Sequence, residues 1–234
     1  VCQLSQIHLS GTLAPASLRQ RLVVGLLTSK EPDKRNLGFR ALGAALKTGH
    51  FDFGAVPELT HRSSDYGWKP ANEAEALEWY LGWLRIISDR MDMEPARIVL
   101  ADHLLGLCSV VGLREHLKNL TEKAVGIDGW PEGWLALKQI LKWDKKRLDQ
   151  PEIQEVSDLA KRIAPGSLEQ RIKAFVFAKG LVGDAWEDPD DKEDDGLSSW
   201  DRLLKKVEDL ARQAAKEPNV IRRLLPDMMT RGGQ

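Results

Sequence analysis

The side chains with the most varied binding chemistry lie together in one segment, Thr48 to Pro70, which reads TGHFDFGAVPELTHRSSDYGWKP. The segment mixes hydrogen-bond donors, a cation and aromatic ring faces between two strong helix patterns. Aromatic residues and Arg dominate the energetic hot spots of binding interfaces. The candidate binding residues are therefore His50, Phe51, Phe53, His61, Arg62, Asp65, Tyr66 and Trp68.

The length and composition of this segment indicate that it is ordered. Connections of more than about 12–15 residues are uncommon in compact domains and are usually functional or disordered. Disordered segments are poor in aromatic residues, and this one is rich in them. We expect 48–70 to be an ordered loop, with a turn at Asp65–Gly67 and Trp68 docked on the first helices.

Two interpretations of such a loop stay open. In the first, an Ω-type loop folds back onto its own scaffold, and Phe51, Phe53 and Trp68 fill the groove between helices. In the second, the same residues face a partner or a ligand. An enzyme site at the loop is a third possibility.

No motif in the chain indicates a metal or cofactor site. The five His form no H-x-x-E-H, H-E-x-x-H or Cys/His pattern. The stretch from Asp191 matches four positions of a calcium loop, but position twelve is Arg202, where a bidentate Glu is required. His103, beside Asp102 in an apolar helix pattern, is interpreted as a core or interface histidine satisfied by hydrogen bonds. We predict no metal ion and no cofactor.

Nucleophilic catalysis and phosphate binding lack their motifs too. The chain has no G-x-S-x-G and no glycine-rich phosphate cradle. Cys108 lies in an apolar helix pattern, with nothing beside it to activate its thiol. Gly38 and Gly43 fall inside a helix pattern and indicate close helix packing. We predict no catalytic residue.

One helix face is basic and is a candidate for nucleic-acid binding. Its residues are Lys138, Lys142, Lys145, Lys146 and Arg147. Cations near the end of a helix also complement its dipole, so a solvated face is the favoured interpretation. We interpret the tryptophans at 130, 134 and 143 as packing residues rather than base-stacking platforms.

Charge is distributed unevenly along the chain. The stretch Asp184–Asp195 (DAWEDPDDKEDD) has eight acidic residues and one Lys, so its local charge is −7 within a chain of net charge −1. Such blocks are usually solvated, and 184–197 is predicted to be a flexible acidic loop.

Composition and chain limits suggest the setting of the protein. Cys2 and Cys108 are isolated, which favours a reducing compartment over a disulfide framework. No apolar run approaches the roughly 18 residues of a membrane span, and the first residues lack the features of a signal peptide. We therefore expect a cytoplasmic protein. We also interpret the chain as a fragment of a longer polypeptide, because it begins at Val1 and not at an initiator Met.

Helix punctuation predicts an all-α chain of about ten helices. Proline or a capping residue marks almost every start, and no period-2 run of β-branched residues competes. The predicted capping residues are Ser17, Asn72, Ser167 and Ser199, and the helix capped by Ser167 is expected to run to Leu181. The prolines predicted to open helices are Pro32, Pro95, Pro131, Pro151 and Pro218, and Gly112 precedes one more.

Two features favour stacked helix pairs over a closed bundle. SLRQRL at 17–22 and SLEQRI at 167–172 are similar and lie 150 residues apart, which is four units of about 38 residues. The pattern over 77–91 is apolar on two sides, and so is the next helix, as expected for helices sandwiched between layers. We predict one helical-repeat domain over 1–234, an α-solenoid of the TPR or HEAT type. A closed bundle stays the alternative.

Three segments, LGFRALGAALKTGHFDFGA, RSSDYGWKP and GWPEGWLALKQILKWD, resemble helical-repeat regions of large bacterial multidomain proteins. Such regions often follow an NTPase or effector domain, as in STAND-type regulators. The resemblance implies a sensor or scaffold region whose chemistry is carried elsewhere in the parent protein. It transfers no catalytic residue, because no NTPase motif is present here.

The leading functional hypothesis is a non-enzymatic module that binds a protein partner or other domains of its parent chain. The first alternative is a helical enzyme or small-ligand receptor whose pocket is roofed by the 48–70 loop. The second is nucleic-acid binding through the basic face at 138–147. We expect no membrane partner.

Overall fold

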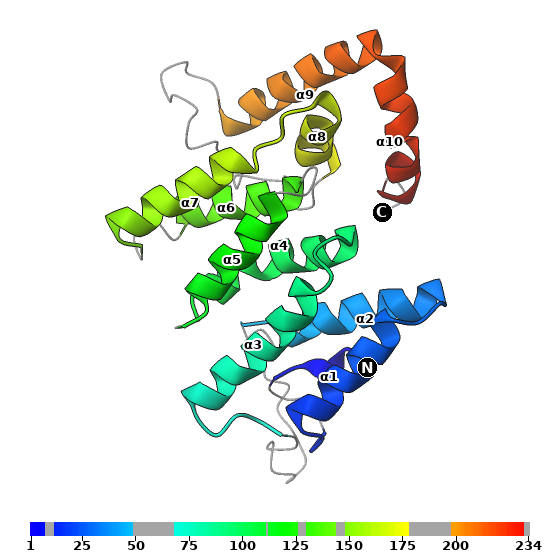
Figure 1. Cartoon of the computed structure of the whole chain (residues 1–234). Helices are drawn as coiled ribbons and strands as arrows, with labels where there is room; N and C mark the ends of the chain where they lie inside the picture. The colour runs from blue at the N-terminus through cyan, green and yellow to red at the C-terminus, as the bar shows by residue number, and fades with distance from the viewer. Residues whose placement is uncertain are drawn as a thin grey trace, which may run out of the picture. The chain divides into compact units, whose positions relative to one another are not determined.

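The computed structural model describes residues 1–7, 12–48, 68–110, 112–125, 130–143, 148–177 and 198–231. Within these residues the chain folds into ten α-helices, and no strand occurs among them (Figure 1). The all-α prediction is confirmed. None of the helices in this part of the chain is long and apolar enough to cross a membrane.

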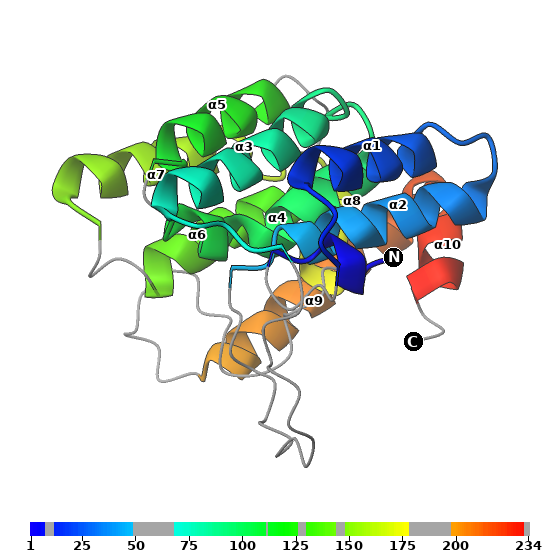
Figure 2. The same ribbon diagram turned by 90° about the horizontal axis from the view of Figure 1, so that it is seen from below.

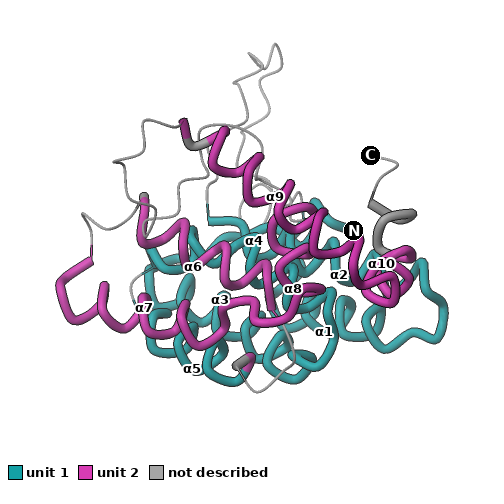
Figure 3. Tube along the Cα trace, turned by 90° about the horizontal axis from the view of Figure 1, so that it is seen from above, with its two compact units in different colours: residues 1–123 teal, residues 124–234 magenta. Residues whose placement is uncertain are grey.

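The chain divides into two compact units, Val1–Lys123 and Ala124–Gln234 (Figure 3). The expectations of a single repeat domain and of a solenoid therefore stay predictions. The acidic loop expected at 184–197 lies outside the described residues.

The first unit holds a short 3₁₀ turn, η1 (Gln3–Ser5), and five helices, the last of which, α5, ends just inside the second unit. The helices are α1 (Ala16–Leu27), α2 (Pro32–Ala45), α3 (Glu73–Ser88), α4 (Glu94–Cys108) and α5 (Arg114–Val125). Helices α1 and α2 lie side by side, α2 also packs on η1 and α4, and α3 contacts α1, α2 and α4 (Figures 1 and 2).

The second unit is built from α6 (Pro131–Trp143), α7 (Gln150–Arg162), α8 (Leu168–Ile172), α9 (Ser199–Lys216) and α10 (Pro218–Arg231). Helix α8 continues directly into a π-helical segment, Lys173–Phe177, although the sequence predicts one regular helix to about residue 181. Helix α6 packs on α7, and α9 packs on α8 and α10. The core between the last three helices comprises Leu168, Ile172, Leu210, Ala214, Val220 and Leu224.

Local capping explains most of the helix starts. The Asn72 side chain accepts a hydrogen bond from the backbone N–H of Glu75 at 2.9 Å, which satisfies one of the free donors at the start of α3. Complete capping boxes start α7, α8 and α9, with Asp149, Ser167 and Ser198 as the capping residues. The predicted cap of α9 was therefore one residue too late.

Ser17 does not cap α1, so that prediction was wrong. The helix begins at Ala16, because the carbonyl of Pro15 already accepts from the N–H groups of Leu18 and Arg19 at 3.1 and 3.3 Å. Ser17 is thus the second residue of α1, whereas Ser167 lies just before α8. The segments SLRQRL and SLEQRI occupy different helix positions, and their similarity is no evidence for a repeat.

Helix α3 is buried on two sides, as its pattern predicts. Trp79, Trp83 and Ile86 form one stripe, and the other contributes Tyr80, Leu84 and Ile87; the exposed fraction of these side chains is 9% or less.

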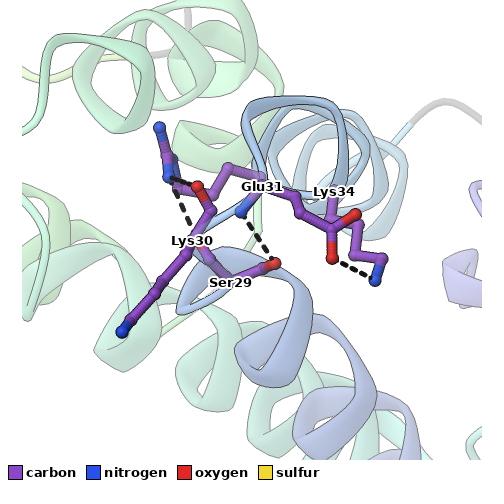
Figure 4. A network of polar contacts seen from close by, with 5 residues as sticks. Ser29, Lys30, Glu31 and Lys34 are labelled. Carbon is purple, nitrogen blue, oxygen red and sulfur yellow. Dashed lines mark hydrogen bonds and ion pairs between the residues drawn. The ribbon is translucent and has the colours of Figure 1, made fainter.

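Two interhelical turns of the first unit are closed by the same contact. Arg35 Nη1 donates to the carbonyls of Ser29 and Lys30 at 3.0 and 2.9 Å. Arg97 Nη1 donates to the carbonyls of Met91 and Asp92 at 2.9 and 3.0 Å. In both cases the Arg is the fourth residue of its helix and reaches back five and six residues. Figure 4 shows the first turn. There the backbone N–H of Glu31 donates to Ser29 Oγ, and Lys34 Nζ donates to the Glu31 carboxylate.

Close packing of α1 on α2 leads to a test on two glycines. A Cβ at Gly38 would lie 3.0 Å from the backbone nitrogen of Leu27, whereas a Cβ at Gly25 would have no neighbour within 4 Å. We expect Gly38→Ala to lower the free energy of unfolding by about 1–3 kcal/mol through overpacking. Gly25→Ala should raise it by up to ~1 kcal/mol, because Ala is the better helix former. Urea unfolding at low protein concentration measures both. Equal stabilisation by the two substitutions would contradict the close approach.

Candidate functional site

Trp68 is the one residue among the eight candidates of the 48–70 loop that the structure describes. The other seven, at positions 50, 51, 53, 61, 62, 65 and 66, lie outside the described residues. The candidate site can therefore be built from the two ends of the segment 49–67. One end follows α2 at Leu46–Thr48, and the other returns at Trp68 just before α3.

The Trp68 end is docked on the helices of the first unit. The ring of Trp68 stacks on that of Trp79 in α3, with centroids 5.4 Å apart and an interplanar angle of 25°. Its backbone N–H donates to the carbonyl of Thr12 at 2.7 Å. The guanidinium of Arg19 in α1 lies 5.4 Å from the Trp68 ring centroid. The predicted docking of Trp68 on the first helices is confirmed.

Arg19 binds the chain that leads into α1. It is only 4% exposed. Its Nε donates to the carbonyl of Ala14 at 2.8 Å, Nη1 to that of Gln6 at 2.9 Å and Nη2 to that of Thr12 at 3.0 Å. These bonds hold together three positions of the N-terminal segment.

The charge of Arg19 has unusual surroundings. The guanidinium lies 5.5 Å from the Trp79 ring centroid as well as against Trp68. Burial lowers its pKa from the ordinary value, but an Arg side chain stays protonated in proteins. It forms no ion pair with a carboxylate in the described part of the chain. Backbone dipoles and two ring faces therefore stabilise this charge. In the sequence, Arg19 is one of two arginines in SLRQRL, and no motif there marks it as a buried residue.

The other end of the segment is fastened to α3 as well. Trp79 Nε1 donates to the carbonyl of Ala45 at 3.0 Å, and the Tyr80 hydroxyl donates to the carbonyl of Lys47 at 3.1 Å. Burial raises the pKa of Tyr80 to about 12, so the phenol stays neutral and keeps its donor proton. The next residue, Thr48, lies so close to Gly106 of α4 that a Cβ there would collide with its side chain.

Both ends of the segment 49–67 thus meet at two adjacent residues of α3. Trp79 contacts Ala45 on one side and Trp68 on the other, and Tyr80 adds the bond to Lys47. Closely spaced ends are the defining geometry of an Ω-type loop. The arrangement fits both a loop that plugs its own scaffold and a loop that presents a binding surface.

The aromatic cluster continues into Trp83. Its ring meets that of Trp79 edge-on, with centroids 5.5 Å apart and an angle of 66°. Trp83 is fully buried, and its indole Nε1 has no hydrogen-bond partner in the described part of the chain. An unpaired buried donor costs about 1–3 kcal/mol, so ring packing must offset that cost here.

His103 lies on α4 and faces α2. A Cβ at Gly43 would be 3.4 Å from His103 Nε2. Burial lowers the pKa of His103, and the positive charge of Lys47 lowers it further. The interpretation as an interface histidine fits its half-buried place. The hydrogen bond expected for its side chain is absent among the described residues.

The basic face lies partly within the described residues. Lys138 and Lys142 are described, and positions 145 to 147 are not. Lys138 Nζ lies 5.8 Å from the ring centroid of Trp134, which meets Phe175 edge-on at 5.6 Å. Trp134 is only 6% exposed, so it packs in the unit and offers no face to a base. Lys206 of α9 lies 5.9 Å from the ring of Phe175, a neighbour that the sequence pattern did not reveal.

No group of three or more His, Cys, Asp or Glu side chains in the described part of the chain is arranged to hold a metal ion. Comparison with known proteins adds no assignment. Neither a protein-family model, nor a curated protein, nor a solved structure matches this sequence.

The first prediction from the site concerns Arg19. Replacing it by Met would leave three carbonyls without their donor and remove the charge between two rings. We expect Arg19→Met to lower the free energy of unfolding by about 3 kcal/mol, because unsatisfied buried polar groups carry such costs. Arg21→Met, on the exposed side of the same helix, should change it by less than about 0.5 kcal/mol. Urea unfolding measures both values, and equal losses would refute the role given to Arg19.

The second prediction concerns pH. The folded-state pKa of His103 is depressed, so the unfolded chain binds a proton at a higher pH than the folded chain does. The contribution of His103 to stability is therefore complete above the ordinary His pKa and decreases as pH falls through it. We expect the free energy of unfolding to fall between about pH 7.5 and pH 5.5, and to fall less in His103→Gln. The same pH slope in both proteins would show that His103 does not titrate in this way.

Proposed function

We propose that this chain is a non-enzymatic helical-repeat module for protein–protein recognition, and that the segment 48–70 is its binding surface. The observation that carries the proposal is the fastening of both ends of the segment to Trp79 and Tyr80 of α3. An aromatic-rich segment with fixed ends loses less conformational entropy on binding than a free one, because part of that cost is met on folding.

The repeat character is supported by the two arginine-closed turns. Arg35 closes the α1–α2 turn and Arg97 closes the α3–α4 turn through carbonyls five and six residues earlier. In both helix pairs the turn is closed by an Arg at the same helix position. This similarity is expected if the two pairs are copies of one structural unit. A side-chain contact of this kind is more specific than the similarity between SLRQRL and SLEQRI.

The spacing of the two arginines supports an insertion at 48–70. The interval from Arg35 to Arg97 shortens to about 43 residues when 49–67 is left out, and two-helix repeats of the HEAT type span about 40–47 residues. Insertions in repeat proteins form loops on one face, which is often the binding face. The segment 48–70 is then an extra element between two ordinary repeat units.

The proposed partner is a protein or another domain of the parent chain. Arg62 and the rings of Phe51, Phe53 and Tyr66 are the residue types that carry binding energy in protein interfaces. The parent is proposed to be a large cytoplasmic bacterial protein of the STAND type, in which this module acts as a sensor or scaffold.

The proposal is tested by removing the segment and keeping its ends. Residues 50–66 are replaced by a Gly-Ser linker of about six residues, which leaves Thr48, Trp68 and their contacts in place. We expect the free energy of unfolding of this variant to lie within about 1 kcal/mol of that of the wild-type chain, because the described contacts remain. Proteins retained by the immobilised chain from an extract of its source organism should no longer be retained.

A second variant tests the side chains of the segment while keeping its full length. Phe51→Ala with Phe53→Ala should weaken retention by at least about tenfold if these rings are hot spots. Glu78→Ala on α3 serves as the control, because this side chain is exposed and outside the segment. If the linker variant and the wild-type chain retain the same proteins, the segment is not the binding surface.

A further inference from the structure

Exposed apolar side chains are confined to two parts of the described chain. Among the described residues, the large apolar ones with an exposed fraction above about a third all lie before residue 23 or after residue 175. The described helices from α2 to α7 expose no such residue. Scattered apolar residues on a surface need no explanation, but contiguous patches often mark contact sites.

The first patch is a stripe on α1. Leu18 and Leu22 are 47% and 49% exposed, and they lie on one helix face because they are four residues apart. Gly25 extends the same face and has open space where a Cβ would be. The opposite face of α1 is buried through Arg19, Val23 and Leu27. We call Leu18, Leu22 and Gly25 the α1 stripe.

The second patch is a stripe on α9. Trp200 and Leu204 are 51% and 43% exposed and also four residues apart, while Leu203 and Leu210 are buried on the neighbouring face. Ala211 continues the exposed side. We call Trp200, Leu204 and Ala211 the α9 stripe.

The charges beside the two stripes have opposite signs. Arg21 borders the α1 stripe, and α1 contains no acidic residue. Asp201 and Glu208 are the charged residues nearest the α9 stripe around the helix, and both are exposed. Glu208 also pairs with Arg212 at 3.4 Å, so Asp201 is the acidic border residue that forms no ion pair within the described part of the chain. Two exposed apolar stripes with complementary borders can pack as a pair of helices.

We propose that the α1 stripe of one copy of this chain packs against the α9 stripe of a second copy. A second copy is the occupant because every molecule carries both complementary faces. Such a contact joins two different surfaces, so it is heterologous and leaves one free stripe at each end of a dimer. It extends to larger assemblies as concentration rises, or closes into a ring.

The contact is tested with two charge variants. One carries Leu18→Glu and Leu22→Glu, and the other carries Trp200→Glu and Leu204→Glu. The average mass of the wild-type chain, measured by sedimentation or light scattering, should rise with concentration between about 1 and 500 µM, as expected for a small interface. Each variant alone should stay monomeric, with association weakened by at least about a hundredfold.

Mixing the two variants gives the decisive measurement. The first variant keeps its α9 stripe and the second keeps its α1 stripe, so the mixture should form a dimer and nothing larger. A mixture that stays monomeric, a single variant that still associates, or a wild-type chain that stays monomeric over this range would each overturn the proposal.

Two controls keep the test independent of folding and net charge. Arg40→Glu changes the net charge as much as either variant but lies outside both stripes, and it should associate like the wild-type chain. The milder pairs Leu18→Ala with Leu22→Ala, and Trp200→Ala with Leu204→Ala, should each weaken association in the same direction. Unchanged association in both milder pairs would also overturn the proposal, whatever the fold of the Glu variants.

Discussion

The buried guanidinium of Arg19 is the interaction on which the first unit depends most. A buried charge is costly unless its hydrogen bonds are satisfied, and here three backbone carbonyls and two indole rings surround it. The carbonyls belong to Gln6, Thr12 and Ala14, so one side chain binds three described positions that precede α1. The same Trp79 that contacts Arg19 also binds Ala45 at the end of α2.

Arginine serves the same purpose at smaller scale in the two turns of this unit. Its guanidinium presents several donors in a rigid fork, so one side chain can bind two successive carbonyls of a turn. Arg35 and Arg97 do this at the α1–α2 and α3–α4 turns. A Lys ammonium on a flexible stem offers no such fixed geometry. Each of these guanidinium groups therefore closes the turn that precedes its own helix.

Helices α3 and α9, one from each unit, differ in the number of faces that they bury. In the first unit, α3 is covered on both sides, its Trp79 and Trp83 meet edge-on, and Trp68 stacks on Trp79. In the second unit, α9 buries a single face against α8 and α10, and Lys206 Nζ lies over the ring of Phe175. A helix buried on one side leaves the apolar residues at the border of that face exposed. Exposure of Trp200 and Leu204 follows from this one-sided packing.

The sequence alone determined the helical fold, most helix starts and the two-sided burial of α3, because these depend on interactions within a few residues or on a periodic pattern. Asn72 and Ser167 cap their helices as predicted, whereas Ser17 does not, because Pro15 starts its helix earlier. Of the candidate site, the docking of Trp68 was predictable from its aromatic character. Tertiary structure alone decided the roles of Arg19 and Trp79, since the latter reaches a carbonyl 34 residues away. No local pattern separates Arg19 from the other 33 cations among the 34 Lys and Arg of the chain, because packing selects the one that is buried.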